Sequence, residues 1–455
     1  MSSDENYDVA YDYTVRFYPR WFTWTQFHVN SDNIQQSTGK RSFANRLTGP
    51  MGMGPEYKVV VAINDDTIYA EAFLDVSSGP VYLTLPPYPN VYSVLQLDVY
   101  GNIFSTTLSE APPSAGGTYA FVQRGYSAAL PSGVTMVEMP YPFTMIAIRI
   151  DKYTSQNVNV TKDAEAFRRG LCMQTTYDPS ESGRQDGKTL VLPLSFFGVS
   201  VKLMADEGLA AAPEAFLTTL QEAMASRDTQ PITEDDQALI RRFNAAFAAA
   251  KTTVDYDSRP LAAIIRGAQA AHAALINRWQ SHRGPTNWIH FNNIGKWGTN
   301  YLDRAALTEY IQVGNDWKAA YYADAFVDGS GVPLDGGSFA YTITFEQDQL
   351  PEYKRFWSLT AYTPGAVELV PNSSNKYVVA SYTSKLFTAK DGSLTIYIQA
   401  DEPKRKDKEK EQEKIANWLP VPKGPFSLLF RVYGPEGSAL EGTYVVPNIH
   451  RGQPH

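Results

Sequence analysis

The sequence contains one cysteine among its 455 residues and no run of about 18 or more apolar residues. Cys172 cannot form an internal disulfide, which agrees with a reducing compartment and predicts a buried packing role for this thiol. The missing apolar run predicts that the chain does not enter a membrane. The first residues lack the basic and apolar regions of a secretory signal. We therefore expect a soluble, cytoplasmic protein, unless a leader segment has been removed.

An excess of positive charge and the common cofactor motifs are also missing. The formal net charge is −8, which argues against a nucleic-acid partner because a phosphate backbone requires a concentrated basic surface. No Walker loop, dinucleotide fingerprint or Gly-x-Ser-x-Gly motif occurs. The six histidines form no metal-type pair. The sequence predicts a small-molecule ligand and no cofactor, with Mg or Mn beside Asp66 and Asp98 as the alternative.

Aromatic residues and turn formers are abundant. The chain has 28 Tyr, 22 Phe, 29 Pro and 31 Gly, a composition typical of many short strands joined by turns. With 43% hydrophobic residues, the chain can bury a substantial core, and its length predicts two or three domains. We expect a mainly β protein.

Hydrophobic periodicity divides the chain into four parts. We expect a helical or aromatic lead-in over residues 1–55, a β domain over 56–200, a helical insert over 201–318 and a second β domain over 319–455. The predicted strands include Val81–Leu85, Val91–Asp98, Gly117–Val122, Val134–Met139, Phe143–Ile150, Ser338–Phe345, Phe356–Tyr362, Leu394–Ile398 and Phe426–Tyr433. The predicted helices are Glu214–Ala225, Glu234–Thr253, Arg259–Gln280 and Tyr301–Tyr310.

Local residue patterns predict two helix starts and the character of one charged segment. Thr233 followed by acidic residues indicates a helix N-cap, and Ser258 before Pro260 indicates another helix start. Within Tyr7–His28 the aromatic spacing does not separate a helix from buried coil. The mixed-charge run Lys404–Lys414 is typical of a solvated loop or short helix.

A polar group interrupts two strand-like runs in the first predicted β domain. Asn64, Asp65, Asp66, Thr67 and Tyr69 follow one another closely, between the apolar runs 57–63 and 81–85. Such a group predicts a site at a strand end or sheet mouth, where the tyrosine would contact a ligand. The alternative is a turn, because Asn and Asp side chains hydrogen-bond to their own backbone.

Several separated stretches resemble a known two-domain family. They are Asn64–Tyr69, Phe73–Pro80 and Leu95–Phe104 in the first β domain, and Gly298–Ala305, Asp328–Gly336, Phe356–Tyr362 and Asn417–Ser427 further along. The chain resembles proteins in which domain of unknown function 1254 is followed by domain of unknown function 1214. The resemblance implies two jelly-roll-like β-sandwich domains with a helical insert between them, an α+β protein overall. It implies no activity, since jelly rolls serve many functions.

The resemblance also singles out Asn64 and Asp66, which share one face at a spacing of two. Gln96 and Asp98 have the same spacing on a nearby predicted strand, and Asn102 lies just beyond. If the strands are neighbours, these side chains form one polar patch in which a buried aspartate has a raised pKa and acts as a general acid or base. The alternative is a hydrogen-bond network that fixes strand register.

Two histidines are further candidates for acid–base catalysis. His28 and His290 both lie among aromatic residues, where a histidine can exchange a proton near neutral pH. The alternative for each is a core histidine whose ring nitrogens are satisfied by the protein.

Five more residues are candidates for substrate binding. Arg304 and Arg431 lie among apolar neighbours and either bind an organic carboxylate or pair with an aspartate. Tyr301, Trp357 and Trp418 supply aromatic walls or belong to the core.

Together these features favour a cofactor-independent enzyme that acts on a small organic molecule by lyase, isomerase or hydrolase chemistry. The alternative is a non-catalytic jelly-roll module that binds a carbohydrate or apolar ligand, or a structural oligomer. We expect a homo-oligomer in either case.

Overall fold

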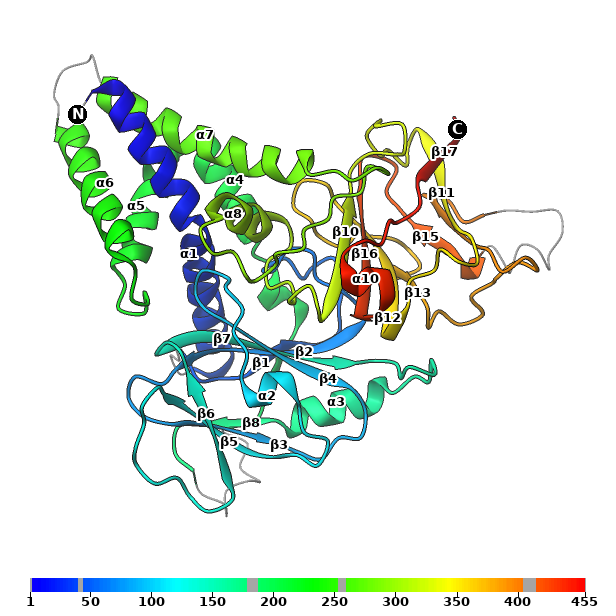
Figure 1. Cartoon of the computed structure of the whole chain (residues 1–455), viewed down its shortest axis with the longest axis horizontal. Coiled ribbons are helices and arrows are strands. Elements are labelled where there is room, and N and C mark those ends of the chain that lie inside the picture. The colour runs from blue at the N-terminus through cyan, green and yellow to red at the C-terminus, as the bar shows by residue number, and fades with distance from the viewer. Residues whose placement is uncertain (1, 40–43, 178–186, 253–258, 404–414, 455) are drawn as a thin grey trace.

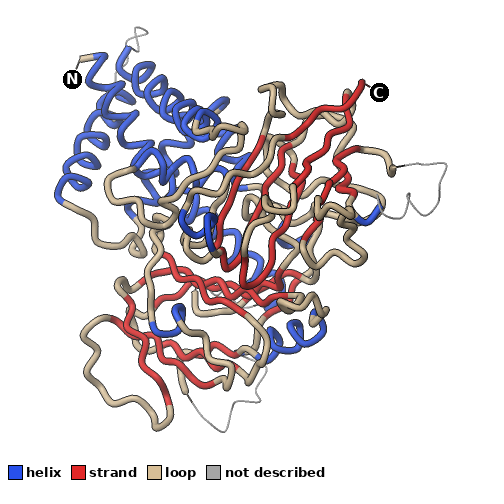
Figure 2. The backbone as a smooth tube through the Cα atoms, turned by 45° about the vertical axis from the view of Figure 1, so that its right-hand side comes forward, coloured by secondary structure: helices blue, strands red, loops and turns tan. Residues whose placement is uncertain are grey.

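The computed structural model describes residues 2–39, 44–177, 187–252, 259–403 and 415–454. The longer helices gather at one end of the molecule, and two β units, which contain the shorter helices, lie below and beside them (Figure 1). The same separation of helices from strands is visible after a turn of the view (Figure 2). The predictions for Ser258 and for the charged run 404–414 lie outside the described residues. Among the described helices, none is long and apolar enough to cross a bilayer.

The N-terminal β unit consists of two sheets around a shared core. Alternate residues of β2, from Ile68 to Leu74, point into this core and meet Leu83 and Phe121 of the facing sheet. One sheet has the order β4-β7-β2-β1-β9 and the other β6-β5-β3-β8. The bounds are β1 Thr48–Pro50, β2 Thr67–Asp75, β3 Val81–Leu85, β4 Tyr92–Leu97, β5 Gly117–Gln123, β6 Val134–Met139, β7 Phe143–Asp151, β8 Cys172–Gln174 and β9 Leu190–Leu192; helices α2 Thr107–Glu110 and α3 Thr161–Gly170 accompany them.

The C-terminal β unit also has two sheets around one core. Ile343 and Ile396 of one sheet meet Leu359 and Phe430 of the other. The sheet orders are β10-β16-β12-β13 and β15-β14-β11-β17. The bounds are β10 Ala320–Ala325, β11 Phe339–Phe345, β12 Tyr353–Tyr362, β13 Val378–Ala380, β14 Leu394–Gln399, β15 Trp418–Pro420, β16 Ser427–Pro435 and β17 Ile449–Pro454, with helix α10 at Gly437–Glu441.

The long first helix joins the helical layer to the N-terminal β unit. Ser2 and Glu5 form a capping box at its start, and it packs against α5, α6, α7 and α8. Its aromatic residues have mixed spacing because it is buried on several sides, by helices and by a sheet. The helical elements are α1 Ser3–Thr38, η3 Leu194–Phe197, α4 Val201–Ala211, α5 Pro213–Ala225, α6 Glu234–Thr252, α7 Arg259–Ser281 and α8 Tyr301–Tyr310.

Most predicted elements are present, and the mixture of helices and strands is confirmed. The expectation of a mainly β protein is wrong, because the described helices contain more residues than the described strands. The Thr233 side chain accepts a hydrogen bond from the Asp236 amide at 3.2 Å, as expected of an N-cap. The expected strand over 57–63 is wrong. This segment is irregular because Ala62 has a φ of 52°, and its amides bond to two separate segments, at Phe197 and Val367.

Candidate functional site

A single carboxylate lies in the middle of the sheet face that packs against α1. Along β2, Tyr69, Glu71 and Phe73 alternate with the residues that enter the N-terminal core. Glu71 pairs with Ala147 of β7 on one side and Thr48 of β1 on the other. The strand register therefore fixes this carboxylate on the central part of the sheet.

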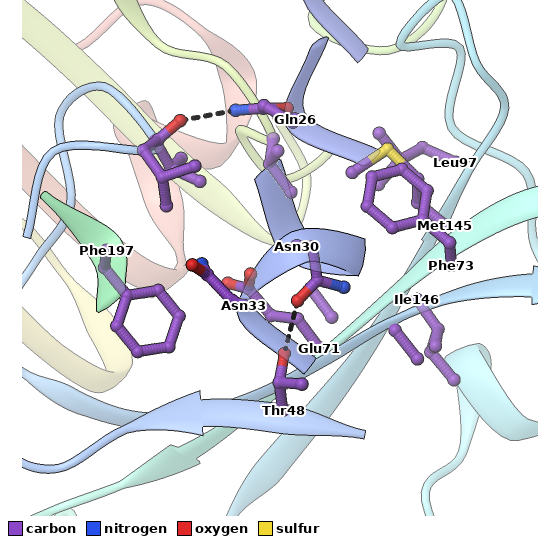
Figure 3. Close-up of a pocket in the computed structure, with 15 residues that line it drawn as sticks. Gln26, Asn30, Asn33, Thr48, Glu71, Phe73, Leu97, Met145, Ile146 and Phe197 are labelled. Atoms are coloured by element: carbon purple, nitrogen blue, oxygen red, sulfur yellow. Dashed lines mark hydrogen bonds between the residues drawn. The ribbon is translucent and has the colours of Figure 1, made fainter. Parts of the chain in front are cut away.

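The facing side of α1 carries amides where a helix packed on a sheet would normally carry apolar residues. Gln26, Asn30 and Asn33 are spaced four and three residues apart, so they share one helix face. Asn30 accepts a hydrogen bond from the Thr48 hydroxyl at 3.2 Å. Figure 3 shows the amide ends of Asn30 and Asn33 close to Glu71, whereas the amide of Gln26 points away from it.

Two of these amides are anchored to backbone carbonyls. Gln26 Nε2 donates to the Val59 carbonyl at 2.7 Å, and Asn33 Nδ2 donates to the Phe196 carbonyl at 2.6 Å. Their positions are therefore fixed by the protein before any ligand arrives.

Apolar side chains complete a small cavity, which we call the inner cavity. Phe73, Leu97, Met145 and Phe197 are among its walls (Figure 3). Its volume is about 40 Å³, which accommodates a few atoms and not a whole drug-sized ligand. Glu71 is thus a carboxylate that lines a small, largely apolar cavity.

Burial raises the pKa of Glu71, and the positive charge of Arg149 opposes this effect. Arg149 does not form an ion pair with the carboxylate. It donates instead to Asn315 Oδ1 at 3.0 Å and to the Val313 carbonyl at 2.7 Å. Within the described part of the chain Glu71 makes no hydrogen bond, so its oxygens are available to a ligand.

The predicted residues Asn64 and Asp66 lie at the junction of the two β units. Asp66 accepts hydrogen bonds from Ser358 Oγ at 2.9 Å and from the Tyr382 hydroxyl. Asn64 Nδ2 donates to the Tyr433 hydroxyl at 2.7 Å. Burial raises the pKa of Asp66. Both side chains therefore fasten the loop before β2 to the C-terminal unit.

Asp98 and Gln96 lie elsewhere, so the expected single polar patch is wrong. Asp98 accepts hydrogen bonds from Asn102 Nδ2 and Gln230 Nε2, both at 2.9 Å. Gln96 lies inside the N-terminal unit and accepts a hydrogen bond from Thr106. The strand register points Gln96 toward the inner core, and the turn after β4 holds Asp98. The two aspartates considered for Mg or Mn thus have separate partners.

The two predicted histidines have different surroundings. His290 Nδ1 lies 2.7 Å from the Tyr322 carbonyl, to which it donates, and its ring stacks on Tyr321. Burial lowers its pKa, as for a core histidine. His28 lies on α1, with its ring 4.4 Å from that of Trp24, and lines a second cavity.

The remaining predicted binding residues lie outside the inner cavity. Arg304 donates to the Arg16 carbonyl at 2.5 Å and lies over the ring of Tyr301. Arg431 donates to the Ala62 carbonyl at 2.5 Å. Both arginines thus bind backbone, where an aspartate or an organic carboxylate was expected.

The predicted aromatic walls also belong to the packed structure. Trp357 lies in the C-terminal core, and Trp418 donates to the Gln399 carbonyl at 2.8 Å. Tyr69 is buried beside Arg149, whose guanidinium lies 5.5 Å from its ring centre.

A cluster of charges in the helical layer has the side chains to hold a metal ion. Asp206, His272 and Glu309 place their ligand atoms within 4.8 Å of one another. However, Lys202 Nζ lies 2.6 Å from Glu309 and 2.9 Å from Asp206, and Tyr18 donates a further hydrogen bond to Glu309. The lysine already supplies the positive charge that a cation would bring, so we interpret the cluster as an ion network.

Sequence reasoning did not identify Glu71. The available signal was a lone charge in the apolar stretch 67–74, at the spacing of Tyr69 and Phe73. The facing amides of α1 are more than 35 residues away, and only the packed structure brings them together.

Comparison with one solved structure agrees with this architecture. A crystal structure of the VPA0106 protein from Vibrio parahaemolyticus is similar, with a TM-score of 0.60 and 18% identity, covering 98% of this chain and 100% of that one. A putative uncharacterized protein from Burkholderia cenocepacia gives a TM-score of 0.44 and 14% identity over 95% of this chain and 87% of that one. A comparison with curated protein sequences gave no match.

Family models match both β units. The model described as protein of unknown function (DUF1254) matches residues 44–175, and that described as protein of unknown function (DUF1214) matches residues 319–437. The order of the two matches is the predicted one. The chain therefore belongs to the family in which a DUF1254 domain is followed by a DUF1214 domain.

Proposed function

We propose that this protein is an enzyme that transfers a proton to or from a small organic molecule, with Glu71 as the acid–base group. The observation that carries the proposal is a carboxylate that opens into a cavity and makes no hydrogen bond within the described residues. Burial raises the pKa of Glu71, which makes its carboxylate a stronger proton acceptor than that of an exposed glutamate and suits it to acid–base chemistry. The chemistry would be of the lyase, isomerase or hydrolase type.

The surroundings of Glu71 suit a developing negative charge on the substrate. Asn30 and Asn33 contribute amide groups to the same cavity, and amide N–H groups can stabilise an enolate or oxyanion. The apolar walls limit water, which strengthens such hydrogen bonds. Because the inner cavity holds only a few atoms, the reacting end of the substrate would enter it and the remainder would lie outside.

The test compares Glu71→Gln with Glu222→Gln, which changes an exposed glutamate on α5. Each protein is incubated in D₂O with a panel of small ketones, esters and hydroxy acids, and deuterium incorporation or turnover is followed by NMR. Turnover should fall by about 100-fold or more in Glu71→Gln and stay unchanged in Glu222→Gln. Equal turnover by Glu71→Gln and the parent protein would contradict the assignment.

A second measurement needs no substrate. Because burial raises the pKa of Glu71, ionisation costs folding free energy as pH rises, and this cost is absent below the unfolded value of 4.5. Glu71→Gln should therefore be more stable than the parent protein at neutral pH, and the difference should vanish in acid. A variant that is less stable at neutral pH would show that the carboxylate has a structural partner.

A non-catalytic binding module is the alternative function. The same cavity could retain a ligand by hydrogen bonds to Glu71 and the amides without any reaction. A compound that raises the unfolding temperature and is recovered unchanged would favour this alternative.

We further propose that each β unit is a jelly-roll-like sandwich. Two facing sheets around one shared core support this proposal in both units. An experimental structure in which the strand connections follow another topology would refute it.

A further inference from the structure

A larger cavity lies beside the inner cavity, and we call it the outer cavity. Its volume is about 260 Å³, just below the range of about 300–1,000 Å³ that is usual for ligand sites. Trp24, Phe27 and His28 of α1 form one wall, and Phe143 at the start of β7 forms another. The turn that follows α5, from Ser226 to Asp228, contributes to the rest of its lining. A compound with one or two rings matches this space.

Three phenyl rings separate the two cavities. Phe27 and Phe143 line the outer cavity, and Phe73 lines the inner one. The ring centres of Phe27 lie 5.1 Å from Phe73 and 5.2 Å from Phe143, and those of Phe73 and Phe143 lie 6.0 Å apart. The outer cavity is thus close enough to hold the part of a substrate that the inner cavity cannot.

The charged side chains of the outer cavity differ in their existing partners. Asp228 forms an ion pair with the buried Arg20 at 3.0 Å. Asp75 accepts hydrogen bonds from the Ser77 amide at 2.9 Å and the Ser77 hydroxyl at 2.5 Å. Arg227 is exposed and makes no hydrogen bond or ion pair within the residues that the structure describes. The positive charge of Arg227 is therefore available to a ligand in this cavity.

We propose that the outer cavity binds an aromatic organic acid, with its ring among Trp24, Phe27 and Phe143 and its carboxylate on Arg227. Aromatic walls bury a ring system, and the planar guanidinium binds a carboxylate through two hydrogen bonds. This binding site depends only on the geometry of the outer cavity. Only the identification of its occupant as the substrate of Glu71 rests on the proposed function.

The test uses isothermal titration calorimetry with 2-naphthoate and with the uncharged 2-naphthamide on the full chain. The acid should bind more tightly than the amide. Arg227→Ala should weaken naphthoate binding about tenfold, which is the effect of losing a charge-assisted hydrogen bond. It should leave the amide unaffected. Arg241→Ala, which removes an exposed arginine of α6, is the matched control and should change neither.

Three further variants separate the outer cavity from its surroundings. Trp24→Ala should weaken both ligands, whereas Trp317→Ala should not, because Trp317 does not line the outer cavity. Glu71→Gln should leave naphthoate affinity unchanged, so a failed proton-transfer assay would not affect this result. Equal affinity for acid and amide, insensitivity to Arg227→Ala, or no binding of either compound would overturn the proposal.

Discussion

Replacing His272 by glutamine should remove a pH-dependent contribution to stability from the helical layer. Its ring Nε2 lies 3.2 Å from Asp206 and 3.5 Å from Glu309. Burial lowers the pKa of His272, but hydrogen bonds and charge interactions with the two carboxylates outweigh it and raise the pKa from 6.5 to about 9. Lys202 and Tyr18 face the same cluster, and their pKa values are raised as well.

The magnitude follows from the difference between the folded and unfolded pKa values. A rise from 6.5 to about 9 corresponds to about 3 kcal/mol of stabilisation by the protonated ring. Because the folded pKa is the higher one, this stabilisation is complete below pH 6.5 and is lost as pH rises through about 9. The pKa of Glu309 is lowered, so this carboxylate stays ionised throughout the same interval.

Urea unfolding of the parent protein and of His272→Gln, followed by circular dichroism between about pH 6 and pH 9.5, measures this contribution. The stability advantage of the parent protein should shrink by about 3 kcal/mol across that interval. Groups common to both proteins cancel in the difference. His450→Gln, which changes an exposed histidine, is the matched control variant. A pH-independent difference for His272→Gln would refute the charged-ring interpretation.

Two further predictions concern packing and buried charge. Gly267→Ala places a Cβ 2.3 Å from the Tyr7 carbonyl oxygen, so α1 and α7 must separate, and stability should fall by about 1–3 kcal/mol despite the better helix propensity of alanine. Gly365→Ala, where the new Cβ meets nothing within 4 Å, is the control in the same unfolding assay. Arg355→Met should cost about 3–5 kcal/mol because Asp151, whose side chain is 3% exposed, loses its ion-pair partner between the two β units. Lys423→Met removes an exposed partner of Asp401 and should cost less than about 1 kcal/mol, so equal losses for the two variants would contradict the role of burial.

The sequence by itself determined most of the regular elements. The strands Val81–Leu85 and Val134–Met139 and the helix Tyr301–Tyr310 have the bounds that were predicted, because strand propensity and helical periodicity are local properties. The segment 57–63 was misassigned because its apolar residues resemble a strand, whereas its backbone amides bond to Phe197 at the end of η3 and to Val367, both distant in the sequence.

The candidate sites were decided by the tertiary structure. The sequence spacing predicted that Asn64 and Asp66 share a face. Their hydrogen bonds go to Tyr433 and Ser358, and each partner lies about 300 residues or more further along the chain. Glu71 acquires its environment only when α1 lays its amides against β2, and the outer cavity forms where α1 and the turn after α5 approach the sheet. Secondary structure follows from neighbouring residues, whereas the pKa of a carboxylate depends on which distant groups exclude water from it.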